Sequence, residues 1–258
     1  KYSDQDVYEK RPLGDTILEL KNFSGEGFRN INLTVKKGSI VGLTGLQGAG
    51  SSELMQCMFG VTRAYSGEMR AMGKVMRDHS IHTAMKDQIA MLASNRKENS
   101  VIPDMSILEN MYLSEHTLSA WKPAISKKKE IESYKKYKEM LNIKANSCED
   151  LITSLSGGNQ QKVFLARWLN TDAEILLLDN PTQGIDVGAK AEIYQIMDEL
   201  TRQGKSIILI STDLPEVIGM SDRVVIMREG YTVLEIDKSE MNQETILAYA
   251  SGGVSENE

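Results

Sequence analysis

The order of hydrophobic and polar residues along the chain predicts its elements. Residues 17–20 and 31–35 largely alternate apolar and polar side chains, which predicts two half-buried antiparallel strands. Residues 39–44 then form a short apolar run that leads through glycines into a helical period over 53–59, which predicts a strand, a loop and a helix. Three later runs are continuously apolar: 89–92, 175–178 and 207–210. Such runs are typical of central parallel strands covered by helices on both faces, so we expect an α/β core.

Two further patterns extend this core. Only helical patterns occur between residues 107 and 147, notably over 127–141, which predicts a block of helices inserted into the α/β core. Residues 224–227 and 231–234 flank an Arg-Glu-Gly turn and predict a hairpin that closes the sheet. A last helix is expected over residues 240–250.

Composition restricts the functions that this core can have. The 258 residues include 30 basic and 36 acidic side chains, a formal charge of −6, so we expect no nucleic-acid partner. Cys57 and Cys148 lack CxxC or Cys/His spacing, which predicts reduced thiols rather than a disulfide framework or a zinc site. No stretch approaches the ~20 apolar residues of a membrane span, and no signal-peptide pattern is present. We therefore expect a cytosolic chain.

The start of the chain differs in composition from the rest. Residues 1–14 are polar, begin with Lys1 rather than Met and include Pro12-Leu13-Gly14, features that are typical of a linker. We expect a linker-like segment over 1–14, a folded domain over 15–258, and a chain that is a fragment of a longer polypeptide.

A glycine-rich segment joins the strand at 39–44 to the helix after it. It consists of Gly45, Leu46, Gln47, Gly48, Ala49, Gly50, Ser51 and Ser52. Backbone N–H groups converge at such a turn and the helix dipole favours an anion, which predicts a phosphate-binding loop with Ser52 as a Mg²⁺ ligand. The pattern G-x-x-x-x-G-K-[ST] needs a lysine where this chain has Ser51, so weaker nucleotide binding is expected. The alternative is a plain glycine-rich turn between a strand and a helix.

Asp179 ends the buried strand at 175–178, the place where a phosphate-loop fold puts the acid that supports Mg²⁺. We interpret it as a Walker B aspartate and a second metal-binding residue. A core strand that merely ends in a surface aspartate is the alternative, and the Pro181-Thr182 and Gly184-Ile185-Asp186 that follow disfavour it.

A second segment predicts an anion-binding helix start. It contains Leu155, Ser156, Gly157, Gly158 and Asn159. Ser156 is a suitable N-cap for a helix that runs through Leu169, and the alternative is an ordinary capped helix after a glycine turn. Two such sites far apart in one chain are explained if a nucleotide is held between two domains, with its phosphates on one loop and its γ-phosphate against the other. A head-to-tail dimer is implied.

These segments resemble motifs of the ATP-binding cassette (ABC) family over roughly residues 17–250. The similarity is to the second cassette of monosaccharide importers of the ribose, galactoside and xylose type, and rests on four segments: GLQGAGSSEL at 45–54, LSGGNQQKVFLARWL at 155–169, DNPTQGIDVGAK at 179–190 and LPEVIGMSDRVVIM at 214–227. Such proteins carry two cassettes in tandem, which would explain the linker-like start.

The resemblance implies a fold. It is an α/β P-loop NTPase fold of ABC type, with a mixed central sheet covered by helices on both faces. An N-terminal antiparallel β subdomain and a helical subdomain inserted at about 105–170 complete the nucleotide-binding domain at 15–258.

The resemblance also implies cofactors and partners. The cofactors are ATP and Mg²⁺. The partners are a first cassette on the same polypeptide, or a second ABC domain, and transmembrane permease subunits that hold the chain at the inner face of the cell membrane.

Several positions depart from the family pattern. Asn180 stands where the family has a catalytic glutamate, Thr212 where it has a switch histidine, and Ser94 at the expected Q-loop position. An asparagine can orient a water but is a poor proton acceptor, so general-base assistance is lost. Phe23 and Phe28 are candidates for stacking on adenine, and both also suit the core.

These departures shape the expected function. The chain is expected to be an ABC-type ATPase domain of a sugar importer whose own hydrolytic site is impaired. Its intact signature loop, residues 155–159, is expected to serve the partner cassette. Alternatives are a non-catalytic nucleotide-sensing or docking module, the ATPase of a nucleoside or signalling-furanoside importer, and a soluble ABC protein of translation or DNA repair. The acidic charge disfavours the last of these.

Overall fold

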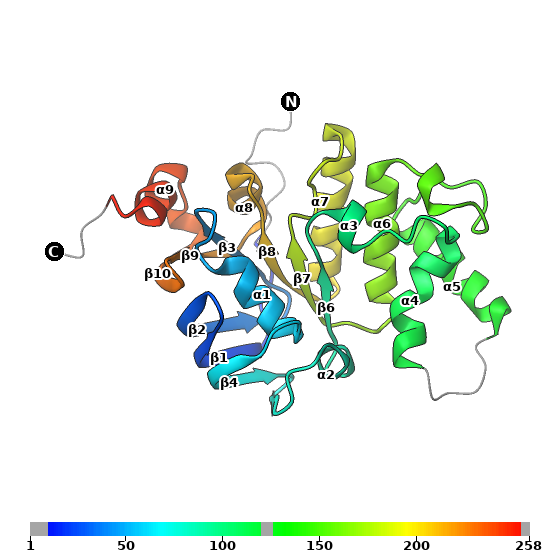
Figure 1. Cartoon of the computed structure of the whole chain (residues 1–258). Coiled ribbons are helices and arrows are strands. Elements are labelled where there is room, and N and C mark those ends of the chain that lie inside the picture. Colours follow the sequence, from blue (N-terminus) through cyan, green and yellow to red (C-terminus); the bar gives the residue numbers. More distant parts are fainter. Residues whose placement is uncertain (1–9, 120–125, 254–258) are drawn as a thin grey trace.

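The computed structural model describes residues 10–119 and 126–253, and they form two sheets with helices around them (Figure 1). The four-stranded sheet has the order β2-β1-β4-β5. Its strands are β1 (Thr16–Gly25), β2 (Phe28–Lys36), β4 (Ala64–Ala71) and β5 (Lys74–Val75). All neighbours in it are antiparallel. The expected antiparallel β subdomain is confirmed, and β4 extends it by a strand that the hydrophobic pattern did not reveal.

The six-stranded sheet has the order β10-β9-β3-β8-β7-β6. Its strands are β3 (Ile40–Gly45), β6 (Ile89–Leu92), β7 (Ile175–Asp179), β8 (Ser206–Ile210), β9 (Arg223–Arg228) and β10 (Tyr231–Asp237). The pairs from β9 to β6 are parallel, and β10 pairs antiparallel with β9 as the expected hairpin. The mixed central sheet of an α/β fold is therefore confirmed.

Helices cover both faces of this sheet. They are α1 (Ser51–Phe59), α2 (Ile81–Lys86), α3 (Arg96–Asn99), α4 (Ile107–Leu118), α5 (Lys127–Met140), α6 (Gly157–Leu169), α7 (Val187–Arg202), α8 (Leu214–Met220) and α9 (Gln243–Ser251). In Figure 1 the four-stranded sheet and helices α4, α5 and α6 lie on opposite sides of the six-stranded sheet. No helix in the described parts of the chain is long and apolar enough to cross a bilayer.

The continuous apolar strands are buried on both faces, as their sequence predicts. In β7, Ile175 and Leu177 belong to the core shared with α1 and the four-stranded sheet. Leu176 and Leu178 belong to the core shared with α4, α5 and α6. Because successive side chains of a strand point to opposite faces, one short run supplies both cores. The loops at the carboxyl ends of these strands are thereby held on a rigid support.

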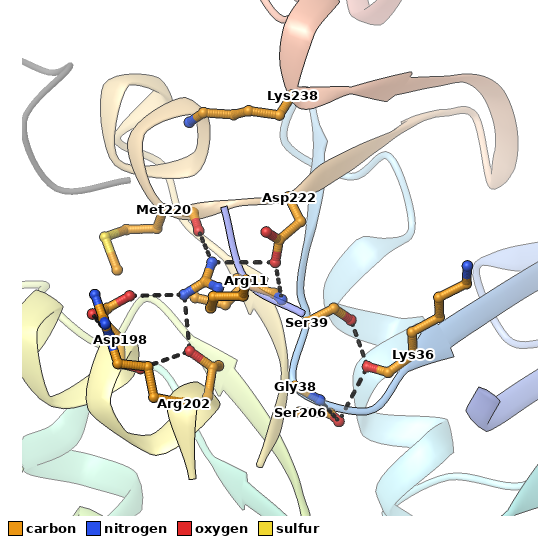
Figure 2. A network of polar contacts seen from close by, with 12 residues as sticks. Arg11, Lys36, Gly38, Ser39, Asp198, Arg202, Ser206, Met220, Asp222 and Lys238 are labelled. Atoms are coloured by element: carbon orange, nitrogen blue, oxygen red, sulfur yellow. Dashed lines mark hydrogen bonds and ion pairs between the residues drawn. The ribbon is translucent and has the colours of Figure 1, made fainter. Parts of the chain in front are cut away.

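The segment before β1 is anchored to the domain at Arg11, which is only 7% exposed. Figure 2 shows its guanidinium between two carboxylates: Nη1 lies 3.1 Å from Asp198 Oδ1 and Nη2 lies 3.1 Å from Asp222 Oδ2. Nη1 also donates to Thr201 Oγ1 at 2.8 Å. Asp222 Oδ2 in turn accepts from the backbone N–H of Ile40, the first residue of β3. Arg11 therefore joins the expected linker to α7, to the turn before β9 and to the start of β3, whereas residues 1–9 lie outside the described residues.

Candidate functional site

The glycine-rich loop joins β3 to α1 and has the backbone of a phosphate-binding loop. Gly48 and Gly50 adopt φ values of +80° and +99°, which side chains disfavour. A Cβ on Gly50 would lie 2.4 Å from the carbonyl oxygen of Gly27, and one on Gly45 would lie 2.4 Å from that of Met227. Glycine is therefore required at residue 50 by both conformation and space. The loop opens α1, whose first-turn N–H groups have no partner within the helix and face the position of an anion.

Backbone hydrogen bonds join this loop to the β9–β10 turn and, through that turn, to β2. The carbonyl of Ala49 accepts from the N–H of Gly230, in the β9–β10 turn, at 3.0 Å. The carbonyl of Gly230 accepts from the N–H of Arg29 in β2 at 2.8 Å, which links the two hairpins behind the loop. These bonds connect the phosphate loop to both sheets.

Asp179 lies at the carboxyl end of β7, beside the phosphate loop, and is 2% exposed. Its carboxylate forms hydrogen bonds with the side chains of Asn180, Ser94 and Ser52. Burial raises the pKa of Asp179, and these three hydrogen bonds oppose the rise. The structure therefore brings together Ser52 and Asp179, the two residues predicted to bind metal, and adds Ser94 to them.

The donors at this position fit a magnesium ion. A carboxylate and a hydroxyl are hard oxygen ligands, and Mg²⁺ commonly takes one or two protein oxygens and completes its octahedron with phosphate oxygens and water. A bound cation would favour the ionised carboxylate and so offset the effect of burial. Within the described residues, no group of three or more His, Cys, Asp or Glu side chains forms a metal cage. Ser52 and Asp179 therefore suit Mg²⁺ that arrives with a nucleotide.

Asn180 connects two of the substituted catalytic positions. Its Nδ2 donates to Asp179 Oδ1 at 2.8 Å, and its Oδ1 accepts from the backbone N–H of Thr212 at 2.8 Å. Its backbone is left-handed, with φ of +50°, and its N–H donates to the carbonyl of Ile210 at 2.8 Å. Both ends of the amide are thus engaged within the chain, where they tie the end of β7 to the segment after β8.

The signature segment forms the start of α6, as predicted. Ser156 is the N-cap and its Oγ accepts from the backbone N–H of Asn159 at 3.5 Å and from Asn159 Nδ2 at 2.9 Å. The Oδ1 of Asn159 accepts from the backbone N–H of Lys144 at 2.8 Å, which anchors the loop to the segment after α5. A Cβ on Gly158 would lie 2.5 Å from that of Ala189, so α6 and α7 approach closely here. This geometry presents the first N–H groups of α6 as an anion-binding surface.

The signature loop and the phosphate loop are separate within this chain. No hydrogen bond in residues 10–119 and 126–253 joins residues 155–159 to residues 45–52. Each loop belongs to a different side of the six-stranded sheet, through α1 in one case and α6 in the other. The two loops are thus positioned by different helices and different cores.

The two aromatic candidates for adenine stacking lie in the core. Phe23 is 0% and Phe28 is 1% exposed, and their rings stack on each other with centroids 5.7 Å apart. Of the two interpretations open to the sequence, the core one is confirmed, so neither ring is available to a base.

Arg96, which the sequence did not single out, lies between the signature loop and the segment after Asp179. It follows Ser94 by two residues and begins α3. Its Nε donates to Gln160 Oε1 at 3.2 Å, and its Nη1 donates to the carbonyl of Gln183 at 3.4 Å. An arginine in a polar loop looks like a solvated surface residue from sequence alone, because its partners lie 64 and 87 positions away.

The motifs and their geometry agree with the outcome of sequence comparison. The sequence profile of the ABC transporter family matches residues 28–183, more than half of the chain, and the chain belongs to this family. It is an ABC transporter ATPase domain, homologous to ribose and sugar import ATP-binding proteins.

Several relatives make the relationship concrete. The "Ribose import ATP-binding protein RbsA" of Oceanobacillus iheyensis is 42% identical over 97% of this chain and 51% of its own length. The "Putative ribose/galactose/methyl galactoside import ATP-binding protein 1" of Rhizobium etli is 42% identical over 95% of this chain and 47% of its own. This chain therefore spans about half the length of the curated relatives that it matches.

Solved structures show the same fold. A nucleotide-free ATP-binding cassette from an ABC transporter superposes with a TM-score of 0.77, at 23% identity, over 92% of this chain and 96% of its own. A dimeric post-hydrolysis cassette bound to ADP and Pi gives a TM-score of 0.73 at 22% identity, over 86% of this chain and 99% of its own. The ABC cassette fold is therefore confirmed.

Proposed function

We propose that this chain is one ATP-binding cassette of a sugar ABC importer, in which ATP binding and hydrolysis are coupled to carbohydrate uptake. It works with a second cassette, on the same polypeptide or on another, and with transmembrane permease subunits that place it at the inner face of the membrane. The names of its relatives, which are import proteins for ribose and galactosides, support the sugar as the solute class. Its cofactors are ATP and Mg²⁺.

Within this function, the signature loop contributes more than the chain's own phosphate site does. Ser156, Gly157 and Gly158 form a complete capped helix start. The phosphate loop, by contrast, has Ser51 where a lysine would supply charge, which weakens binding by about 1.5 to 3 kcal/mol. The difference between these two half-sites is the observation that carries the proposal.

The position next to Asp179 supports weak hydrolysis at the chain's own site. Asn180 is a poor proton acceptor, and both ends of its amide are already bonded, to Asp179 and to the N–H of Thr212. One donor and one acceptor position of the amide are thus occupied within the chain, which fixes its orientation, and the amide supplies no base to deprotonate an attacking water. The chain's own site holds nucleotide with little turnover, and the signature loop completes the partner's site.

A pair of substitutions in the complete transporter tests this division of roles. Ser156→Asp keeps an efficient N-cap but places a negative charge where the partner's γ-phosphate would bind, so the ATPase rate should fall at least about tenfold with the melting temperature unchanged. Ser52→Ala removes the hydroxyl from this chain's own site and should lower the rate by less than about threefold. The opposite order, with Ser52→Ala inactivating and Ser156→Asp silent, would overturn the proposal.

A nucleotide-sensing or docking module remains the competing function, because Ser52 and Asp179 keep the donors for a Mg-nucleotide. Such a module would leave the transporter's ATPase rate unchanged with both variants and would still bind ATP in calorimetry.

A further inference from the structure

Arg96, at the start of α3, contacts two other segments, the beginning of α6 and residues 180–186. Its Nε and Nη1 donate to Gln160 and to the carbonyl of Gln183, at 3.2 and 3.4 Å. Its Nη2 lies against the backbone of Gly157, where an added Cβ would come within 2.7 Å of it. Each nitrogen of the planar guanidinium therefore has its own neighbour. Nε binds α6, Nη1 binds the 180–186 segment, and Nη2 packs against Gly157.

The side chain of Gln160 links Arg96 to the backbone at the beginning of the signature loop and just before it. While its Oε1 accepts from Arg96, its Nε2 donates to the carbonyls of Leu155 at 3.2 Å and Ile152 at 3.3 Å. Because an amide has one acceptor end and one donor end, the bond from Arg96 fixes which end of Gln160 faces those carbonyls. Loss of the guanidinium would remove one of the three hydrogen bonds that hold this amide against the turn before Ser156.

The charge of Arg96 is unbalanced by the protein. No carboxylate lies within ion-pair distance of it in the described parts of the chain. Burial lowers the pKa of Arg96 below its ordinary value, and the guanidinium stays charged near neutral pH. It lies beside the amino-terminal end of α6, which carries a partial positive charge of its own. Two positive groups side by side disfavour each other until an anion is bound between or above them.

A purely structural role is the main alternative. A guanidinium that joins three segments also stabilises the fold, and hydrogen bonds to charged groups contribute to that. The charge distinguishes the structural role from a role toward the nucleotide. A side chain that only joins segments could be neutral, whereas Arg96 adds positive charge beside the signature loop.

We propose that Arg96 is a positioning residue for the ATP bound between this chain and its partner: it holds the signature loop and the 180–186 segment in one arrangement and adds positive charge beside the partner's nucleotide phosphates. This inference rests on the proposed role of the signature loop. Arg96 lies outside the signature segment, yet under this proposal it helps to position that segment over the nucleotide.

Charge-conserving and charge-removing variants in the complete transporter test this assignment. Arg96→Gln should lower kcat for ATP at least about tenfold while the KM for ATP changes by less than about threefold, because loop closure rather than nucleotide capture is impaired. Arg96→Lys keeps the charge but loses the fork of donors and should recover part of the rate. Vanadate-trapped nucleotide should fall in the same order, from wild type through Arg96→Lys to Arg96→Gln.

Neighbouring substitutions separate the possible outcomes. Lys97→Gln removes a charge from the next, exposed residue and should leave kcat within about twofold of wild type. If Arg96→Gln and Arg96→Lys both keep kcat within twofold while Ser156→Asp abolishes it, the inference is overturned and the role of the signature loop stands. If Ser156→Asp is also silent, the proposed function fails and the inference fails with it. Equal losses of rate and of melting temperature in Arg96→Gln and Arg96→Lys would show a purely structural role and would likewise overturn the inference.

Discussion

Removal of the Arg11 side chain should destabilise the whole domain, although Arg11 precedes the first strand. Arg11→Ala removes the cation shared by the carboxylates of Asp222, 8% exposed, and Asp198, 17% exposed, while Arg202 stays on Asp198 and the charge of Lys238 still acts on Asp222. Removing one partner of a buried ion pair costs about 3 to 5 kcal/mol when the other charge is left unpaired, so with these cations remaining we expect a loss of no more than about 3 kcal/mol. For a domain of this size, each kcal/mol shifts the melting temperature by about 2 to 4 °C, so a decrease of up to about 6 to 12 °C is expected.

Arg202 provides a matched control on one of the same carboxylates. Its Nε lies 2.7 Å from Asp198 Oδ2, but its side chain is 45% exposed. Exposed ion pairs contribute about 0 to 1 kcal/mol, so Arg202→Ala should have little effect. Thermal unfolding followed by circular dichroism, together with urea titration, measures both variants.

A third variant tests the cause of the loss. Asp222→Asn in the Arg11→Ala background removes the carboxylate charge that Arg11 balanced and keeps an oxygen that can accept from the N–H of Ile40, so it should restore part of the stability. A loss below about 1 kcal/mol for Arg11→Ala, equal to that of Arg202→Ala, would refute the view that the guanidinium balances a buried charge.

Two further predictions concern the phosphate loop and a buried tyrosine. Gly50→Ala should cost about 1 to 3 kcal/mol of unfolding free energy and displace the loop, because its φ is +99° and the Gly27 carbonyl occupies the space of a Cβ, whereas Gly48→Ala has nothing within 4 Å and should cost less. Urea titration of the two variants checks this, and equal losses would contradict it. Burial, with the charge of Asp172 as a lesser cause, raises the pKa of Tyr137 from 10.0 to about 12. Since the folded state holds this proton more tightly, its contribution to stability is complete below about pH 10 and is lost as the pH rises through about 12, so the wild type should lose more stability than Tyr137→Phe over that window.

The fold was predictable from sequence to the extent that burial left a periodic pattern. The strands at 89–92, 175–178 and 207–210 are apolar throughout because both of their faces are covered, and a short run of this kind is typical of a central strand. Strand β4 left no such pattern, because only two of its eight residues are buried, Met69 and Ala71. Strands with polar faces are set by their partner, here β1, rather than by their own composition.

The site was predictable where a function depends on one short segment. The phosphate loop, the signature start and Asp179 each combine a backbone conformation and a residue type within a few positions. The contacts of Arg11 and Arg96 escaped prediction because each guanidinium meets partners more than 60 positions away in sequence. From their local sequence both arginines look like surface residues. Only the tertiary structure shows that their guanidinium groups bind other segments.

The double engagement of Asn180 has a consequence for substitution at this position. An ionised carboxylate here could still accept from the N–H of Thr212, but it could not donate to Asp179. Asn180→Glu would therefore exchange a hydrogen-bond donor for a second negative charge beside the buried aspartate. The side chain at residue 180 thus sets the electrostatic environment of the aspartate before it.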